Sequence, residues 1–118
     1  MRLIDTNVIL RYCLEDNREM LAEAEKIIDE GAFTIPEVLA EVVYVLIKVY
    51  GIERSEVCDT LNNLLEDVDV ADKSSMLEAI SVFRNTSFDF VDCIIIGRNH
   101  ILGEEVFSFD KKLNKHLR

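Results

Sequence analysis

The sequence predicts an α/β fold in which helices wrap a parallel sheet. Short apolar runs alternate along the chain with amphipathic stretches, so the hydrophobic period switches between strand-like and helix-like spacing. The strand–helix order repeats, and strands that are separated by helices pair in parallel. The chain has 118 residues, of which 49% are hydrophobic, with four glycines and one proline. These values are typical of one domain, residues 1–118, with a single core.

The chain begins with a short predicted strand at residues 3–4, which ends at Asp5. Apolar residues then fall at helical spacing over residues 8–12, and again over residues 20–28. Gly31 follows the second of these patterns and suits the C-terminal cap of a helix. We therefore expect one buried strand and two helices in this segment.

A second strand is predicted at residues 32–35, directly before Pro36. Proline suits the first turn of a helix, because the N–H that it lacks would have no partner there. Residues 38–50 are apolar at most positions and are followed by Gly51. We expect them to form the most buried helix of the chain.

The middle of the chain predicts two further helices with a strand between them. Ser55 suits the N-cap of a helix whose apolar positions fall within residues 57–65. The alternating residues 68–70 predict a short third strand. Asp72 then suits the N-cap of a helix with its apolar face over residues 76–83.

The last part of the chain predicts a helix, a strand and a short terminal helix. After a linker at residues 88–91, a helix is predicted to begin near Asp92 and to run to Gly103. Residues 106–109 predict the last strand, and Asp110 opens the terminal helix.

The composition excludes several classes of protein. Cys13, Cys58 and Cys93 are odd in number and never form a CxxC pair, which argues against a zinc ribbon or a disulfide framework. The first residues lack the long apolar segment of a signal peptide, and no stretch approaches the ~20 apolar residues of a membrane helix. We therefore expect a cytoplasmic protein that does not associate with a membrane.

The net charge of −10 has the wrong sign for long-range attraction of a nucleic acid. This objection weakens where bound cations neutralise carboxylates. Several basic residues near the C-terminus leave room for a basic rim around an acidic centre, although lysines in a last helix also suit its dipole. These residues are Arg84, Arg98, Lys111, Lys112, Lys115 and Arg118.

Four acidic residues are predicted to meet at one edge of the sheet. Ligands of parallel sheets bind outside the carboxyl ends of the strands. Converging carboxylates repel one another and raise one another's pKa, and hard cations such as Mg²⁺ or Mn²⁺ relieve that repulsion through oxygen ligands. The four residues, each at or just beyond a strand end or at a helix start, are Asp5, Glu41, Asp92 and Asp110.

Each acid also has an interpretation that involves no ligand. The three aspartates precede helical patterns, where aspartate commonly serves as an N-cap. Glu41 shares a helical face with Glu37, which is its chief rival, and that face could be simply solvated. Asp89 is likewise a rival to Asp92, because both precede the same helix.

Four segments resemble the acidic motifs of PIN domains. The segments LIDTNVIL, PEVLAEVVYVL, FDFVDCIIIG and FSFDKKL occur in the family's order and span nearly the whole chain. Within that family they most resemble the VapC-like toxin ribonucleases of type II toxin–antitoxin pairs. The resemblance implies a three-layer α/β/α fold with a central parallel sheet of four to five strands.

The resemblance also implies a site and a reaction. The carboxylates that it assigns to catalysis and to metal binding are Asp5, Glu41, Asp92 and Asp110. The polar residues around them, which orient carboxylates or water, are Asn7, Ser108, Thr6 and Asp89. A metal held in this way activates water for in-line attack on RNA, leaving a 5′-phosphate and a 3′-hydroxyl. The resemblance further implies a homodimer and inhibition by a small antitoxin protein.

Two other functions deserve comparison with a ribonuclease. A phospho-acceptor receiver domain has a similar length and βα order, but it needs adjacent acids after the first strand, where LIDTN offers one. A PIN scaffold that only binds partners is the second alternative. His100 and His116 have no partner spacing, so we expect them at the surface and assign them no catalysis.

Overall fold

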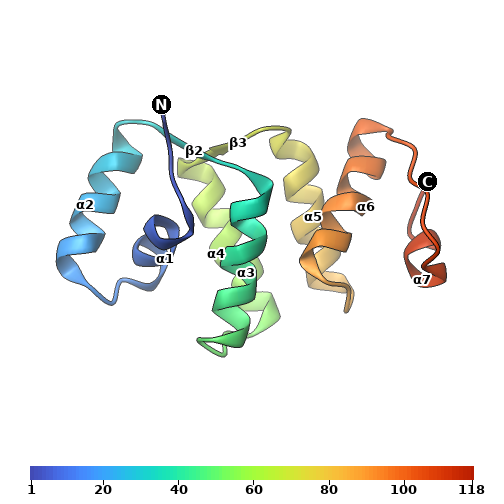
Figure 1. The fold of residues 1–118 in the computed structure, drawn as a ribbon, viewed down its shortest axis with the longest axis horizontal. Coiled ribbons are helices and arrows are strands. Elements are labelled where there is room, and N and C mark those ends of the chain that lie inside the picture. The colour runs from blue at the N-terminus through green and yellow to red at the C-terminus, as the bar shows by residue number, and fades with distance from the viewer. The chain divides into compact units, whose positions relative to one another are not determined.

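The computed structural model describes residues 1–118 and contains three strands and seven helices (Figure 1). The chain divides into two compact units, Met1–Ala71 and Asp72–Arg118. The elements in chain order are β1 (Arg2–Leu3), α1 (Thr6–Leu14), α2 (Arg18–Asp29), β2 (Ala32–Thr34), α3 (Pro36–Lys48), α4 (Arg54–Asp67), β3 (Asp69–Val70), α5 (Lys73–Asn85), α6 (Phe90–Leu102) and α7 (Lys111–Asn114).

The first unit contains a parallel sheet in the order β1-β2-β3, which confirms the predicted α/β class. Leu3 pairs with Phe33, and Phe33 pairs with Asp69, so β2 is the central strand. Two helices connect each strand to the next, as parallel pairing requires. The first strand is shorter and less buried than predicted, because Leu3 is 55% exposed on the edge strand and only Ile4, just beyond it, is buried.

The third helix begins at the predicted proline, with Pro36 in its first turn. Its inward face is made of residues that are almost fully buried, namely Leu39, Val42, Val43 and Leu46. The helix is nevertheless not the most buried one, since α4 buries five residues against these four. The opposite face is open, and Tyr44 on that face is 63% exposed.

Gly97 sets how closely α6 approaches α5 in the second unit, where the two helices run side by side (Figure 1). A Cβ atom on Gly97 would lie 2.5 Å from the Ser75 carbonyl oxygen and 3.0 Å from the Ala79 nitrogen. Phe83 and Phe90 also meet edge to face, with ring centroids 5.3 Å apart. The helix that carries Asp92 is therefore held against its neighbour by backbone contact.

The C-terminal turn is tied to α6 by two neighbouring residues. Asn99 donates to the carbonyl oxygens of Glu104 and Arg118 and accepts the Arg118 N–H at 2.8 Å. His100 bonds through Nδ1 to Glu78 and through Nε2 to the His116 carbonyl oxygen. The prediction that His100 is a surface residue was wrong, because its side chain is only 9% exposed.

The predicted strand at residues 106–109 does not form, and the sheet has three strands instead of four or five. Phe107 and Phe109 are 84% and 91% exposed, with their rings edge to face. The polar groups of Ser108 are used locally, since its carbonyl oxygen accepts from Asn114 and its hydroxyl accepts the Asp110 N–H. Such local side-chain bonds compete with the backbone ladder that a strand needs.

Candidate functional site

The four predicted acids fall in two pockets, one in each unit. In the first unit, Asp5 and Glu41 line one pocket of about 370 Å³ together with Thr6 and Asn7. Leu10 and Val45 complete its wall. The pocket brings together residues of α1 and α3 that are far apart in the sequence, and four of its six lining residues are polar or acidic.

Asp5 sits at the N-cap of α1 in an extended backbone conformation. Its Oδ1 accepts a hydrogen bond of 3.1 Å from the Val8 backbone N–H. The predicted capping role is therefore confirmed. One capping bond leaves the second carboxylate oxygen available, because an ionised carboxylate has about four acceptor positions.

Glu41 is exposed on the open face of α3, one helical turn beyond Glu37. Both glutamates are exposed, but only Glu41 lines the pocket that contains Asp5. The structure therefore separates two residues that the sequence could not tell apart. The outward face of α3 is exposed to solvent, as expected if Glu41 binds no ligand. Glu41 on this face nevertheless lines the pocket that contains Asp5.

The second unit has a larger pocket, of about 530 Å³, that contains Asp89, Asp92 and Asp110. Asp92 is partly buried in the first turn of α6. Burial raises the pKa of Asp92 above its ordinary value, and the negative charges of Asp89 and Asp110 raise it further. The negative charges of the two neighbouring carboxylates thus disfavour the ionised form of Asp92.

The helix boundaries decide between Asp89 and Asp92 as a cap. The α6 helix begins at Phe90, two residues before the predicted start, so Asp89 occupies the N-cap position and Asp92 does not. The Asp89 side chain makes no capping hydrogen bond. The capping interpretation of Asp92 was therefore wrong, and neither carboxylate is committed to the helix end.

Asp110 caps the short α7 helix through two hydrogen bonds. Its Oδ1 accepts from the Lys112 N–H at 2.9 Å and from the Leu113 N–H at 3.1 Å. Ser108 stabilises the turn, because its hydroxyl accepts the Asp110 N–H at 3.0 Å. The Lys112 and Leu113 backbone N–H groups thus orient the Asp110 carboxylate through its Oδ1 atom. Its Oδ2 atom makes no capping bond.

Several residues of the second pocket carry chemistry that the sequence did not assign to a site. They are Phe88, Lys112, Lys115 and His116. The excess of basic residues near the C-terminus signalled Lys112 and Lys115, but spacing alone did not distinguish them from Lys111. His116 lies at the surface as expected, with its ring edge to face against Phe88 at 5.1 Å.

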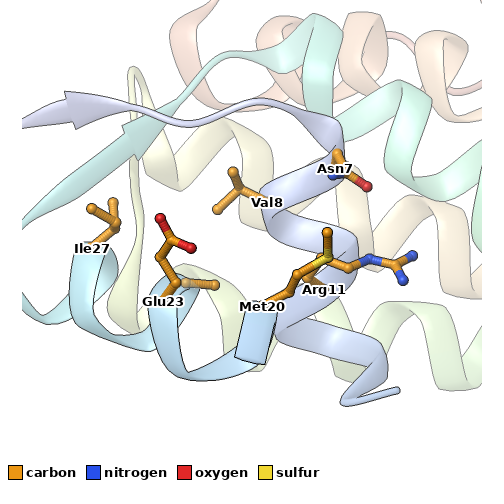
Figure 2. A pocket seen from close by; sticks show the side chains of 7 residues that line it. Asn7, Val8, Arg11, Met20, Glu23 and Ile27 are labelled. Atoms are coloured by element: carbon orange, nitrogen blue, oxygen red, sulfur yellow. The ribbon is translucent and has the colours of Figure 1, made fainter. Parts of the chain in front are cut away.

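Asn7 belongs to the edge of a third pocket, which lies between α1 and α2 (Figure 2). Figure 2 shows Val8 on α1 and Ile27 on α2, with Met20 and Glu23 also on α2. This pocket is mainly apolar and contains a single carboxylate, so it lacks the donors of the two acidic pockets.

The chemical type of the side chains in the two acidic pockets suits a hard divalent cation. Their acidic donors are all carboxylate oxygens, which Mg²⁺ and Mn²⁺ prefer, and they include no thiolate. The structure contains no group of three or more histidine, cysteine, aspartate or glutamate side chains arranged to hold a metal.

The chain matches a known protein family over nearly its whole length. Residues 2–116 match the family model of the PIN domain. The chain belongs to the PIN domain family. This membership sets aside the receiver-domain alternative, since nearly the whole chain matches the PIN domain. It also confirms the resemblance drawn from the four acidic segments.

This PIN domain is similar to a VapC ribonuclease of Aquifex aeolicus strain VF5. The two sequences are 29% identical over 124 aligned residues, which cover 98% of this chain and 91% of the relative. No solved structure matches the chain. In the structure, no helix has both the length and the apolar character needed to cross a membrane.

Proposed function

We propose that this PIN domain is a metal-dependent endoribonuclease that hydrolyses RNA phosphodiester bonds. The observation that carries the proposal is the pairing of the acids: Asp5 with Glu41 in one pocket, and Asp92 with Asp110 in another. Similarity to a VapC ribonuclease supports RNA as the substrate. In this proposal residues 1–118 act as one domain, and all four carboxylates take part in metal binding and catalysis.

The proposed cofactor is Mg²⁺ or Mn²⁺. Asp92 supports it, because burial and then neighbouring negative charge raise the pKa of its carboxyl group, and a bound cation would relieve that cost. Asp5 and Asp110 would each offer the oxygen that is free of capping bonds. Glu41 would add a fourth carboxylate.

The chain's own residues would orient the metal-binding carboxylates. The two capping aspartates are oriented by backbone N–H groups, so little side-chain entropy is lost when they bind. Asn7, Thr6, Ser108 and Asp89 would position carboxylates or water around them. The bound cation would lower the pKa of a water molecule and neutralise charge that develops on the scissile phosphate.

Cleavage of RNA in Mg²⁺ or Mn²⁺, with and without chelator, tests the proposal. We expect Asp5→Asn and Asp92→Asn to lower the cleavage rate by at least about 100-fold, because each removes a ligand. Glu105→Gln is the control, since Glu105 is exposed and lines neither acidic pocket. Cleavage that persists in chelator and in both variants would refute the mechanism. A native protein that binds RNA without cutting it would indicate the silent scaffold.

We further propose that the domain is the toxin of a type II toxin–antitoxin pair, acting in the cytoplasm as a homodimer. The similarity to a protein named VapC ribonuclease supports this role. Induced expression should arrest growth of a bacterial host, and co-expression of a small protein encoded immediately upstream should restore it. Light scattering of the purified chain should give twice the 13.6 kDa mass of the monomer. Normal growth of the host on expression of protein that cleaves RNA would refute the toxin role. It would leave the ribonuclease function unaffected.

A further inference from the structure

Two lysines face the same pocket as the carboxylates of the second unit. Lys112 and Lys115 line it together with Asp92 and Asp110, whereas their neighbour Lys111 does not. Both lysines are exposed, and neither forms an ion pair with a carboxylate. The cationic groups are thus presented beside an acidic centre without being neutralised by it.

The other basic residues of the C-terminal part are placed differently. Arg98 is bound by Glu104 through two hydrogen bonds, of 2.6 and 2.8 Å, and also donates to Asp72. Its guanidinium group is committed to holding α6 and the following turn. Arg118 does not line the pocket and is fixed through its backbone by Asn99. Of the lysines and arginines expected around an acidic centre, only Lys112 and Lys115 line this pocket.

The turn that carries these lysines is anchored on both sides. Asn114, between them in the sequence, donates to the Ser108 carbonyl oxygen at 3.0 Å. The carbonyl oxygen of His116 bonds to the buried His100 ring at 2.6 Å. The Lys112 N–H is held by Asp110. The two lysine backbones are thus fixed relative to Asp110, and only the side chains remain free to reach a ligand.

Other polar groups of the pocket are already engaged within the protein. The Thr86 hydroxyl donates to the Val82 carbonyl oxygen and accepts the Phe88 N–H. The Asn85 amide donates to the Ser81 carbonyl oxygen. The lysines are therefore the strongest uncommitted donors in the pocket, and a lysine ammonium group is well suited to a phosphate as a mobile point charge.

We infer that Lys112 and Lys115 bind the phosphates of a single RNA strand next to the bond that Asp92 and Asp110 address. This inference rests on the proposed ribonuclease function and identifies the subsite that holds its substrate. It also explains how a chain with a net charge of −10 binds a polyanion. Attraction would come from two local cations beside the metal centre, and the field of the whole protein would oppose it.

Fluorescence anisotropy with a labelled single-stranded RNA tests the inference. The background is Asp5→Asn in Mg²⁺, which prevents cleavage and leaves the second pocket intact. The test variant is Lys112→Gln/Lys115→Gln. The control is Lys26→Gln/Lys111→Gln, which removes the same charge from exposed positions outside this pocket. Affinities are measured between roughly 50 and 200 mM salt, because each phosphate contact contributes about 0.7 to the logarithmic salt slope for a single strand.

We expect the test variant to bind about tenfold more weakly and to lose about 1.4 from its salt slope, while the control keeps the slope of the parent. Lys112→Arg/Lys115→Arg should retain binding, since it preserves both charges. In the cleavage-competent protein the test variant should raise KM and leave kcat within about twofold. Equal slopes and KM values for test and control variants, with native cleavage intact, would overturn the inference. If the salt slope of binding depends on the two lysines but the native protein cleaves no RNA, only the proposed function would be refuted.

Discussion

Replacing Gly97 by alanine tests the close packing that positions α6. Intrinsic helix propensity alone favours alanine over glycine by about 1 kcal/mol in a helix interior. The structure predicts the opposite sign, because the added Cβ would lie 2.5 Å from the Ser75 carbonyl oxygen and 3.3 Å from the Ala79 Cβ. The nearest atoms belong to the backbone of α5, so relief requires the two helices to separate. Overpacking of this kind costs about 3 kcal/mol, and the net loss should be about 2 kcal/mol.

Thermal unfolding followed by circular dichroism measures that loss. For 118 residues the entropy of unfolding is about 0.25 kcal/mol/K, so Gly97→Ala should lower Tm by about 8 °C. Ser81→Ala on the exposed side of α5 is the control, since it changes helix propensity without entering the helix contact. A Gly97→Ala protein as stable as the native one, or more stable, would show that α5 and α6 do not pack as closely as described. Because α6 carries Asp92, the variant should also cleave RNA more slowly.

Three further predictions concern the acids. Burial and neighbouring negative charges raise the pKa of Asp92 in the folded chain, so its ionised form destabilises the fold at neutral pH. Asp92→Asn should therefore raise the free energy of unfolding at pH 7. Urea titrations should show that gain vanishing below the ordinary value of 3.8, where Asp92 is protonated in both states. Asp5→Ser should keep the helix cap but lose cleavage, whereas Asp5→Ala should also lose about 1 kcal/mol of stability; equal stabilities would contradict the capping bond. Glu41→Gln should impair cleavage more than Glu37→Gln, and the reverse order in matched assays would exchange their roles.

Much of the fold could be predicted from the sequence, because helix-start residues and the spacing of apolar residues agree with the burial that the structure shows. Pro36 marks the start of α3, and the apolar residues that follow at helical spacing form its buried face. The parallel sheet follows from helices between successive strands. The segment 106–109 has the alternation of a strand as well, but the Ser108 carbonyl oxygen accepts from Asn114 and the Ser108 hydroxyl accepts the Asp110 N–H. Alternation predicts which residues share a face and does not supply a pairing partner.

The candidate site could be predicted by residue type but not by arrangement. The sequence indicated four acids, yet the choice of Glu41 over Glu37 depends on where α1 and α3 meet. The distinction between Lys112 and Lys111 depends on the rotation of a four-residue helix. Burial of His100 depends on Glu78 and on the C-terminal turn, and neither partner lies near it in the sequence. Local pattern contains no information about such contacts.

The capping and metal-binding interpretations of the aspartates are compatible, and the geometry of the caps shows why. A carboxylate has two oxygens, and the caps at Asp5 and Asp110 use only Oδ1 in each case. The backbone bonds then fix the direction of the remaining oxygen before any cation arrives, which reduces the entropy lost on binding. Asp92 differs because it makes no capping bond, and its carboxyl group is instead held among like charges. Asp5 and Asp110 would therefore each offer a pre-oriented oxygen to a cation, and a cation bound at Asp92 would relieve the repulsion from its neighbouring carboxylates.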